Sequence, residues 1–269
     1  MSNRPRRSGA PLTNPPAAGG RIFRNDEGES MKNEQAIRYL SQNVPLHIDM
    51  IEAIRRGNAD VLYLSTRACL LKNRRSDTLH LAADDADAGE AALGTQPSDF
   101  RLVVTHGQAA REATVRIRPT FGCRRPCHQA YYPEKKPQAV PNTCTIAPYP
   151  IERLDDVMMH YDTVGDPSYI IDRIEKGDLF AGYHDGELCG FIGLHDDGSM
   201  GMLEVFPAFR RLHIGTALEQ NLINLCLSHG WTPYCHLFEG NTASIRLQQR
   251  LGLFVTPACE IAWMHEPRT

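Results

Sequence analysis

The residues best suited to chemistry lie in one stretch, residues 203–217, where a strand pattern passes through a turn into a helix pattern. The turn carries Arg210 and Arg211, and the small residues Gly215 and Thr216 open the helix. The first amides of a helix have no partner within it, and the helix dipole places partial positive charge there. A phosphate or diphosphate would satisfy these amides, and a glycine lets a bulky anion approach the backbone. The stretch therefore predicts an anion site, although an ordinary strand–turn–helix with solvated arginines has the same spacing.

Two other groups of polar residues are weaker candidates for chemistry. Cys123, Cys127 and His128 lie close together in a basic run, but a zinc site needs four ligands and no second pair follows them. The acidic run at 84–87 resembles a calcium loop only loosely, because the spacing of the glycine and the terminal glutamate is wrong. We interpret this run as the acidic start of a helix, and we expect no metal site.

Both helices and strands must position the anion site. Beyond residue 141, apolar periodicity and turn residues predict a mixed order of elements. The expected strands are 143–147, 179–183, 188–194, 199–206, 232–238, 253–255 and 260–264, and the expected helices are 151–161, 168–176, 213–228 and 241–250. Asp185-Gly186 predicts a tight hairpin turn between two of these strands.

The first half repeats part of that order more weakly. After two short helices broken near Pro45, we expect strands at 61–65, 68–71, 78–81 and 100–105, and helices at 84–93 and 108–115. Residues 116–132 have no clear pattern, and the prolines that follow them indicate a linker. Residues 1–30 are rich in proline and glycine and poor in apolar residues, so we expect a disordered extension. The repeated order predicts an internal duplication of the fold without a visible sequence repeat.

Composition excludes several classes of function. The chain has 269 residues, of which 42% are hydrophobic and 23% are charged, and its formal net charge is −3. This balance is typical of a globular protein, whereas a non-specific nucleic-acid binder is expected to be basic. No apolar run approaches the roughly 18–20 residues of a membrane span, and the N-terminus lacks the apolar core of a secretory signal. We therefore expect a cytoplasmic protein with reduced cysteines.

The stretch around Arg210 resembles the acetyl-coenzyme-A-binding motif of the GNAT N-acetyltransferase superfamily, Arg/Gln-x-x-Gly-x-Gly/Ala. Arg210 opens the pattern, Gly215 closes it, and His213 stands where the family usually has glycine. Residues 241–247 resemble the Asn-x-x-Ser helix of the family, and 251–253 resemble its Leu-Gly-Phe strand entry. The resemblance covers about 143–269. With the weaker first half, the arrangement looks like the tandem, glycine N-acyltransferase-like group, with a degenerate N-terminal half that holds no cofactor.

The resemblance implies an α/β (α+β) GNAT acyl-CoA N-acyltransferase fold, with a mixed twisted sheet flanked by helices. Its C-terminal module would be complete and its N-terminal module a partial copy. The implied division of the chain is a disordered extension at 1–30, a degenerate GNAT-like domain at 31–140 and a catalytic domain at 141–269.

The resemblance also implies roles for individual residues. A free backbone amide of Val205 or Phe206 would polarise the thioester carbonyl, and the amides of residues 211–216 would hold the diphosphate. The implied cofactor-binding residues are Val205, Phe206, Arg210, Arg211, Leu212, His213, Ile214, Gly215, Thr216, Asn241 and Ser244.

Proton transfer needs separate residues. Glu204 resembles, by its position, the base of some members of the family. A partly desolvated carboxylate there would have a raised pKa suited to proton removal. A solvated glutamate, or one paired with Arg210, fits equally well. His195 and His184 are alternative bases. Gln248 stands where the family often has an acidic tyrosine. A thiol has a pKa of about 8.5, so its thiolate leaves without help, and we predict no dedicated acid, or water in that role.

The expected function is therefore that of an acetyl-CoA-dependent N-acetyltransferase, which would acetylate a primary amine of a small molecule or amino acid. The alternative is a non-catalytic acyl-CoA-binding sensor or scaffold. We expect acetyl-CoA as cosubstrate and a small-molecule acceptor. We expect no metal, nucleic-acid or membrane partner, and a monomer or homodimer.

Overall fold

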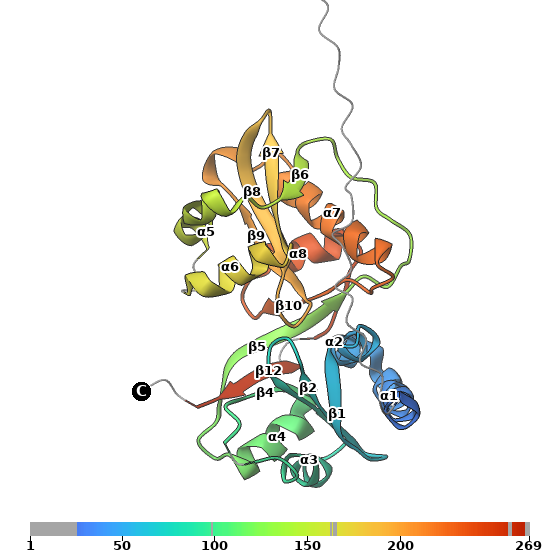
Figure 1. The fold of residues 1–269 in the computed structure, drawn as a ribbon. Coiled ribbons are helices and arrows are strands. Elements are labelled where there is room, and N and C mark those ends of the chain that lie inside the picture. The colour runs from blue at the N-terminus through green and yellow to red at the C-terminus, as the bar shows by residue number, and fades with distance from the viewer. Residues whose placement is uncertain (1–25, 98, 162, 164–165, 258–259, 267–269) are drawn as a thin grey trace, which may run out of the picture.

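The computed structural model describes residues 26–97, 99–161, 163, 166–257 and 260–266 of the chain. Its elements alternate between helices and strands along two halves (Figure 1). In the first half these are α1 (Asp26–Leu40), α2 (Val44–Arg55), β1 (Ala59–Leu64), β2 (Ala68–Asn73), β3 (Leu79–Ala83), α3 (Ala86–Leu93), β4 (Leu102–His106), α4 (Gly107–Ile117) and β5 (Gly122–Tyr131). In the second half they are β6 (Thr145–Pro148), α5 (Leu154–His160), α6 (Pro167–Glu175), β7 (Leu179–His184), β8 (Glu187–Leu194), β9 (Met200–Val205), α7 (Ile214–Ser228), β10 (Tyr234–Phe238), α8 (Thr242–Arg250), β11 (Phe254–Val255) and β12 (Ile261–His265).

The larger sheet has the strand order β1-β2-β3-β4-β12-β5-β10, and β11 pairs with β5 beside this path. Only β3 and β4 run parallel, and the other pairs described in this sheet are antiparallel. The apolar sides of α1 and α2 pack on one part of the sheet, and α3 and α4 pack on another. The mixed sheet flanked by helices confirms the expected fold class.

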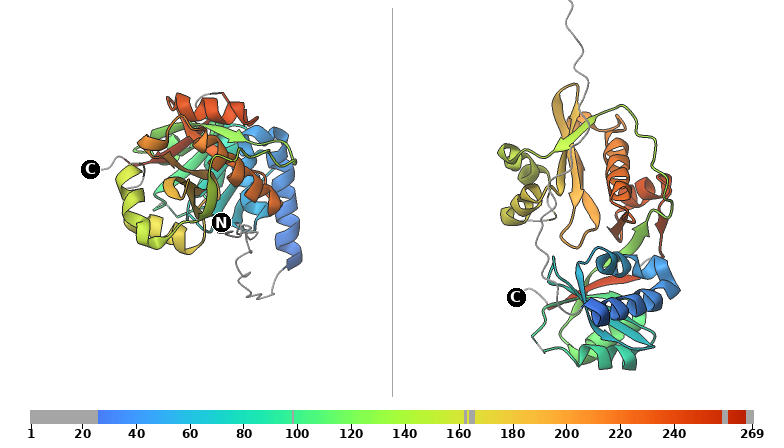
Figure 2. Two further views of the ribbon diagram at one scale, coloured as in Figure 1. Left: turned by 90° about the horizontal axis from the view of Figure 1, so that it is seen from above. Right: turned by 45° about the vertical axis from the view of Figure 1, so that its right-hand side comes forward.

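The smaller sheet has the antiparallel order β6-β7-β8-β9. In the right-hand view of Figure 2, the orange helix α7 lies on one side of this sheet and the yellow-green helices α5 and α6 lie on the other. Ile214, Leu218 and Leu222 of α7 join one buried cluster with β8, whereas Val157 and Ile170 of α5 and α6 join a second. The sheet is thus covered on both faces, which fixes β9 and the turn that follows it.

Strand pairing crosses the expected boundary at residue 140. β12 lies between β4 and β5 of the first half, with Ile261 opposite both His106 and Cys127 (Figure 1). β5 itself falls where the sequence showed no clear pattern. α1 begins at Asp26, so it includes the end of the segment expected to be disordered, and residues 1–25 lie outside the described residues. The division into domains at 31–140 and 141–269 stays a prediction.

Polar contacts join the two halves. The guanidinium of Arg56 donates to the carbonyls of Gly198 (2.9 Å) and Thr232 (3.0 Å), and it lies 4.6 Å from the ring centre of Trp231. Glu52 pairs with Arg56 at 3.2 Å and accepts the amide of Thr232 at 3.0 Å. Both side chains are almost fully buried, so these contacts are well shielded from water. Within the described residues, no helix combines the length and the apolar character that a bilayer crossing requires.

Candidate active site

The turn between β9 and α7 has an unusual backbone path. A short 3-10 turn at Pro207–Phe209 follows β9, and Arg211 and His213 then adopt positive φ angles of 67° and 60°. A left-handed backbone favours glycine. This preference explains why the GNAT motif that the stretch resembles usually has glycine where this chain has His213. α7 then begins at Ile214 with no side-chain cap. Its first amides therefore lack intrahelical partners and are open to an anion.

These amides line a cavity of about 1130 Å³. The cavity opens where β9 and β10 contact each other but belong to different sheets. It brings together most of the predicted site residues, namely Glu204, Val205, Arg210, Arg211, His213, Ile214, Gly215, Thr216, Asn241 and Ser244. Phe206 and Leu212 do not line it. The side chain of Leu212 is exposed on the surface.

A bulge in β9 sets which backbone amides face this cavity. Met202 has a φ of 51°, and Met202 and Leu203 together oppose the single residue Ile192 of β8. Past the bulge, the amide of Phe206 donates to the carbonyl of Cys189 at 2.9 Å, so the expectation that it is free is wrong. Antiparallel ladders alternate bonded and non-bonded pairs, so the amide of Val205 is directed away from β8. Of the two amides expected to polarise a carbonyl, only that of Val205 remains available.

Gly190 on β8 allows the close approach of the bulged strand. A Cβ atom at this position would lie 2.3 Å from the carbonyl oxygen of Glu204 and 3.1 Å from the Cα of Val205. Both contacts are with backbone, which cannot turn aside as a side chain can. The glycine is therefore required for β8 and β9 to meet at the point where Glu204 and Val205 enter the cavity.

Glu204 lies at the cavity with its carboxylate on Arg210. The two side chains are 3.1 Å apart, and the Glu204 side chain is 23% exposed. Arg210 also donates from Nε to the carbonyl of Val205 at 3.1 Å. The side chain of Arg210 thus folds back toward β9. Glu204 therefore has the Arg210 pair that was the alternative to a base, and its role as a base stays a prediction.

Asn241 and Ser244 start the helix on the other side of the cavity. The Asn241 side chain accepts the amide of Ser244 at 3.2 Å and caps α8. This cap fixes the start of α8 beside the start of α7, and it accounts for the Asn-x-x-Ser spacing without a ligand.

Glu219 is a candidate functional residue that the sequence analysis missed. It lies in α7, is 3% exposed, lines the cavity and accepts the side-chain amide of Gln248 at 2.7 Å. Burial raises the pKa of Glu219 to about 7. The sequence signal that could have found Glu219 is its place on the same helical face as the apolar residues Leu222 and Cys226. A carboxyl group with this pKa exchanges a proton near neutral pH.

The far end of the cavity is polar and partly acidic. Nδ1 of His195 lies 2.8 Å from the hydroxyl of Tyr169, and Asp196 and Asp197 line the same end. Burial lowers the pKa of His195 and raises that of Asp196. Of the two alternative bases, His195 therefore faces the cavity. His184 does not line it, and its ring is bonded to the carbonyl of Thr143 instead.

The first half contributes to the same end of the cavity. Ser76, Thr78 and Leu102 line it. Asn73 donates to the carbonyl of Asp197 at 3.4 Å, which ties the first half to the turn that carries the acidic residues. The cavity is thus built by both halves, with the helix starts at one end and this polar group at the other.

Comparison with known proteins identifies the second half. Residues 141–253 match the sequence profile of the Acetyltransferase (GNAT) family. No curated protein sequence matches the chain. Three solved structures are similar over nearly the whole chain. A Drosophila protein has a TM-score of 0.61 at 13% identity, covering 88% of this chain and 96% of that one.

The other two are named as acetyltransferases. A GCN5-related N-acetyltransferase from Kribbella flavida has a TM-score of 0.53 at 15% identity, covering 87% and 96% of the two chains. An acetyltransferase of the GNAT family from Colwellia psychrerythraea has a TM-score of 0.50 at 13% identity, covering 90% and 98%. These likenesses show a shared fold that includes both halves. The recognition made from the sequence is confirmed for residues 141–253, the part of the chain that matches the acetyltransferase (GNAT) family.

Proposed function

We propose that the chain is an acetyl-CoA-dependent N-acetyltransferase that acts on the primary amine of a small molecule or amino acid. The observation that carries this proposal is the uncapped start of α7, which opens into a cavity between two strands that do not pair. A helix start of this kind favours a diphosphate, and the gap between β9 and β10 is where the pantetheine arm would extend.

Binding of the cofactor would use mostly backbone. The amides of Arg211 to Thr216 would hold the diphosphate, and the cationic side chains of Arg210 and Arg211 would add charge. The amide of Val205 would donate to the thioester oxygen as it gains negative charge during attack. Asn241 and Ser244 would border the arm from the α8 side.

The reaction needs one proton removed and one supplied. The amine nitrogen forms a bond to the acetyl carbon, the carbon–sulfur bond breaks, and the products are an amide and the CoA thiol. We propose Glu204 as the base that takes the amine proton once a ligand draws Arg210 from it. Glu219, protonated near pH 7, could return a proton toward the thiolate through Gln248 or water, a role that the sequence left without a residue.

The acceptor would bind at the polar end of the cavity. Asp196 and Asp197 give that end a negative potential, which suits a cationic acceptor whose reacting amine extends along β9 toward Glu204. The ammonium form of that amine must release one proton to water before its nitrogen attacks, and Glu204 then takes the second proton as the amide forms.

The test combines binding with turnover. Acetyl-CoA affinity is measured by calorimetry, and thiol release is followed over a panel of amino acids, polyamines and aminoglycosides. We expect micromolar binding and turnover of at least one amine, with kcat reduced about 10²–10⁴-fold in Glu204→Gln. Glu187→Gln, an exposed glutamate at the start of β8, serves as the matched control. Tight binding without turnover of any amine would support the sensor alternative, and no binding would reject both.

A further inference from the structure

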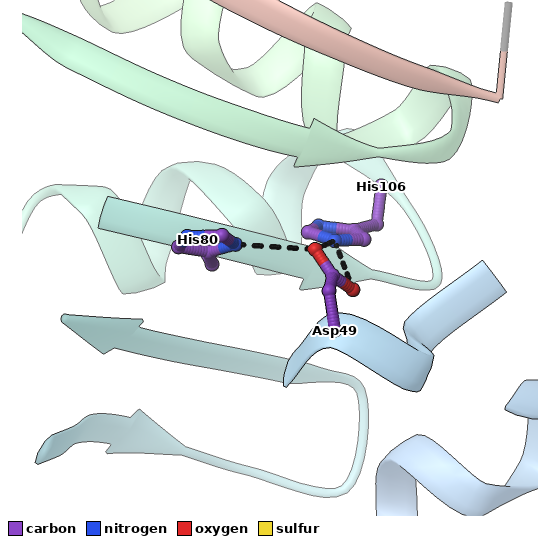
Figure 3. Close-up of side chains that lie close together, drawn as sticks. All are labelled: Asp49, His80 and His106. Atoms are coloured by element: carbon purple, nitrogen blue, oxygen red, sulfur yellow. Dashed lines mark hydrogen bonds and ion pairs between the residues drawn. The ribbon is translucent and has the colours of Figure 1, made fainter. Parts of the chain in front are cut away.

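A second polar group lies outside the proposed transfer site, where the two halves meet. We call it the histidine cluster, and it consists of Asp49, His80, His106 and His236. Figure 3 shows Asp49 reaching from α2 toward the rings of His80 on β3 and His106 on β4. These three are 2%, 2% and 1% exposed, and one ligand atom of each lies within 4.8 Å of the others.

A single carboxylate oxygen is the centre of the cluster. Oδ2 of Asp49 is 2.8 Å from Nε2 of His106 and 3.4 Å from Nδ1 of His80. It is also 3.5 Å from Nε2 of His236, whose side chain is 6% exposed. Three imidazole nitrogens from three different strands therefore converge on one buried oxygen.

Surrounding groups orient two members of the cluster. His106 is held by hydrogen bonds at both ring nitrogens, since Nδ1 lies 3.2 Å from the carbonyl oxygen of Leu81 and Nε2 lies 2.8 Å from Oδ2 of Asp49. An ion that binds Nε2 would take the place of its proton, while the bond to Leu81 keeps the ring in orientation. Gln129 donates to Oδ1 of Asp49 at 2.9 Å. Such outer partners are typical of histidine and carboxylate metal ligands.

Within the described part of the chain, hydrogen bonds satisfy His106 and Asp49 but leave the other two rings of the cluster without such partners. Among the described residues, neither ring nitrogen of His80 or His236 has a hydrogen-bond partner, although all four atoms are buried. A buried polar atom left unpaired destabilises the folded chain. A cation between the rings and Asp49 would accept their lone pairs, and a divalent ion would balance the two carboxylates, Asp49 and Asp197, without net charge.

We propose that the histidine cluster binds one divalent transition-metal ion, and that the ion is Zn²⁺. Imidazole ligands favour zinc over magnesium or calcium, which prefer oxygen. Asp49, His80 and His106 offer three ligand atoms within 4.8 Å of one another, and His236, whose Nε2 lies 3.5 Å from Oδ2 of Asp49, would complete the four-ligand set of a structural zinc site. The ion would pin α2, β3 and β4 to β10, and so join the two halves at the base of the cavity, whose wall includes His236.

The first test is metal content and affinity in tag-free protein. The chain is stripped with a chelator, dialysed and titrated with Zn²⁺ at pH 7 by calorimetry, with zinc counted by mass spectrometry. We expect one Zn²⁺ per chain and a rise in Tm on loading. Loss of an outer partner alone weakens metal sites about 10–100-fold, so His80→Asn, which removes a ligand, should weaken binding by at least about that factor. His229→Asn, an exposed histidine at the end of α7, should bind as the wild type does.

The second test needs no variant, so it stands even if His80→Asn does not fold. Wild-type protein loaded with Co²⁺ should show the visible absorption of a tetrahedral ion, and X-ray absorption of the zinc form should show nitrogen and oxygen neighbours without sulfur. The proposal is overturned if wild type takes up no stoichiometric zinc, if sulfur is found in the shell, or if His80→Asn binds unchanged. If the histidine cluster binds protons and no metal ion, wild-type protein will take up no stoichiometric zinc. None of these readouts depends on acyl transfer.

Discussion

The two halves follow the same order of elements but start their corresponding helices in opposite ways. In the first half, α3 follows β3 and is capped by Asp85, whose side chain accepts the amide of Ala88 at 3.0 Å. In the second half, α7 follows β9 and has no side-chain cap. A carboxylate of the chain itself already satisfies the α3 start, whereas the α7 start is left for an anion from outside.

The strands beside these helices differ in the same sense. β3 and β4 pair as parallel neighbours, with Leu81 opposite Thr105, so that part of the first half is closed. β9 and β10 occupy the corresponding positions but belong to different sheets, and the cavity lies between them. The comparison teaches that the fold alone does not make a binding site. In the first half, the cap of α3 and the pairing of β3 with β4 occupy the groups that remain open in the second half.

The largest expected effect tests whether the halves are separable. Arg56→Ala removes the cation that joins Gly198 and Thr232 and leaves Glu52 buried beside one exposed arginine, Arg55. We expect a loss of roughly 3–5 kcal/mol in the free energy of unfolding, measured by urea denaturation. Arg55→Ala, which removes the exposed partner of the same glutamate, should cost less than about 1 kcal/mol. Equal effects of the two variants would mean that the contact between the halves is not important for stability.

The next effect is the pH dependence that Glu219 contributes in the open half. The pKa of Glu219 is raised from 4.5 to about 7 in the folded chain, so the folded state binds the proton more tightly than the unfolded state. The contribution of Glu219 to the free energy of unfolding should therefore fall as the pH rises from 4.5 to above 7, by roughly 3 kcal/mol at 1.36 kcal/mol per pKa unit. Glu219→Gln keeps the acceptor oxygen for Gln248 and should remove this fall. Urea denaturation of both proteins at pH 5 and pH 8 measures the difference, and parallel curves would contradict it.

A third change makes the open helix start resemble the closed one. Gly215→Glu puts a carboxylate at the start of α7, as Asp85 does at α3, and should weaken CoA binding on the order of 100-fold, or about 2.7 kcal/mol. The cause is charge repulsion and lost space beside the diphosphate. Ser228→Glu adds the same charge at the far end of the same helix and should bind CoA normally. Calorimetry with CoA compares the two, and normal binding by Gly215→Glu would place the diphosphate elsewhere.

The smallest effect concerns the closed half. Asp85→Ala removes the cap of α3 and should lower the free energy of unfolding by about 1 kcal/mol, since the ion pair of Asp85 with the exposed Arg67 adds little. CoA affinity should stay at the wild-type value. Asp87→Ala, an exposed acid in the same first turn, should cost only a few tenths of a kcal/mol. A change in CoA affinity in Asp85→Ala would show that the first half takes part in cofactor binding.

Local features of the fold were predictable because they depend on neighbouring residues. Gly57, Gly177, Gly230 and Gly252 each follow a helix, and all four have the positive φ that favours glycine. The turn at Asp185-Gly186 and the helix start at Ile214 were also found within a residue or so. In each case the backbone preference of one or two residues decides the outcome.

Long-range features could not be predicted in this way. β5 was missed because Pro126 and its arginine neighbours hide a strand that pairs with β10 and β12. The pairing of Glu219 with Gln248 depends on two helices meeting. The histidine cluster draws on residues scattered between 49 and 236, and no short spacing links them.

The place of β12 has a consequence for the order of synthesis. A ribosome makes β4 and β5 well before residues 261–265, yet these residues form the strand that separates them in the sheet. While translation continues, the facing edges of β4 and β5 have unpaired amides and carbonyls, which invite contact with other chains. The larger sheet is therefore completed only after nearly every other strand has been made. A chain released before residues 261–265 would keep the unpaired edges of β4 and β5 in the middle of this sheet.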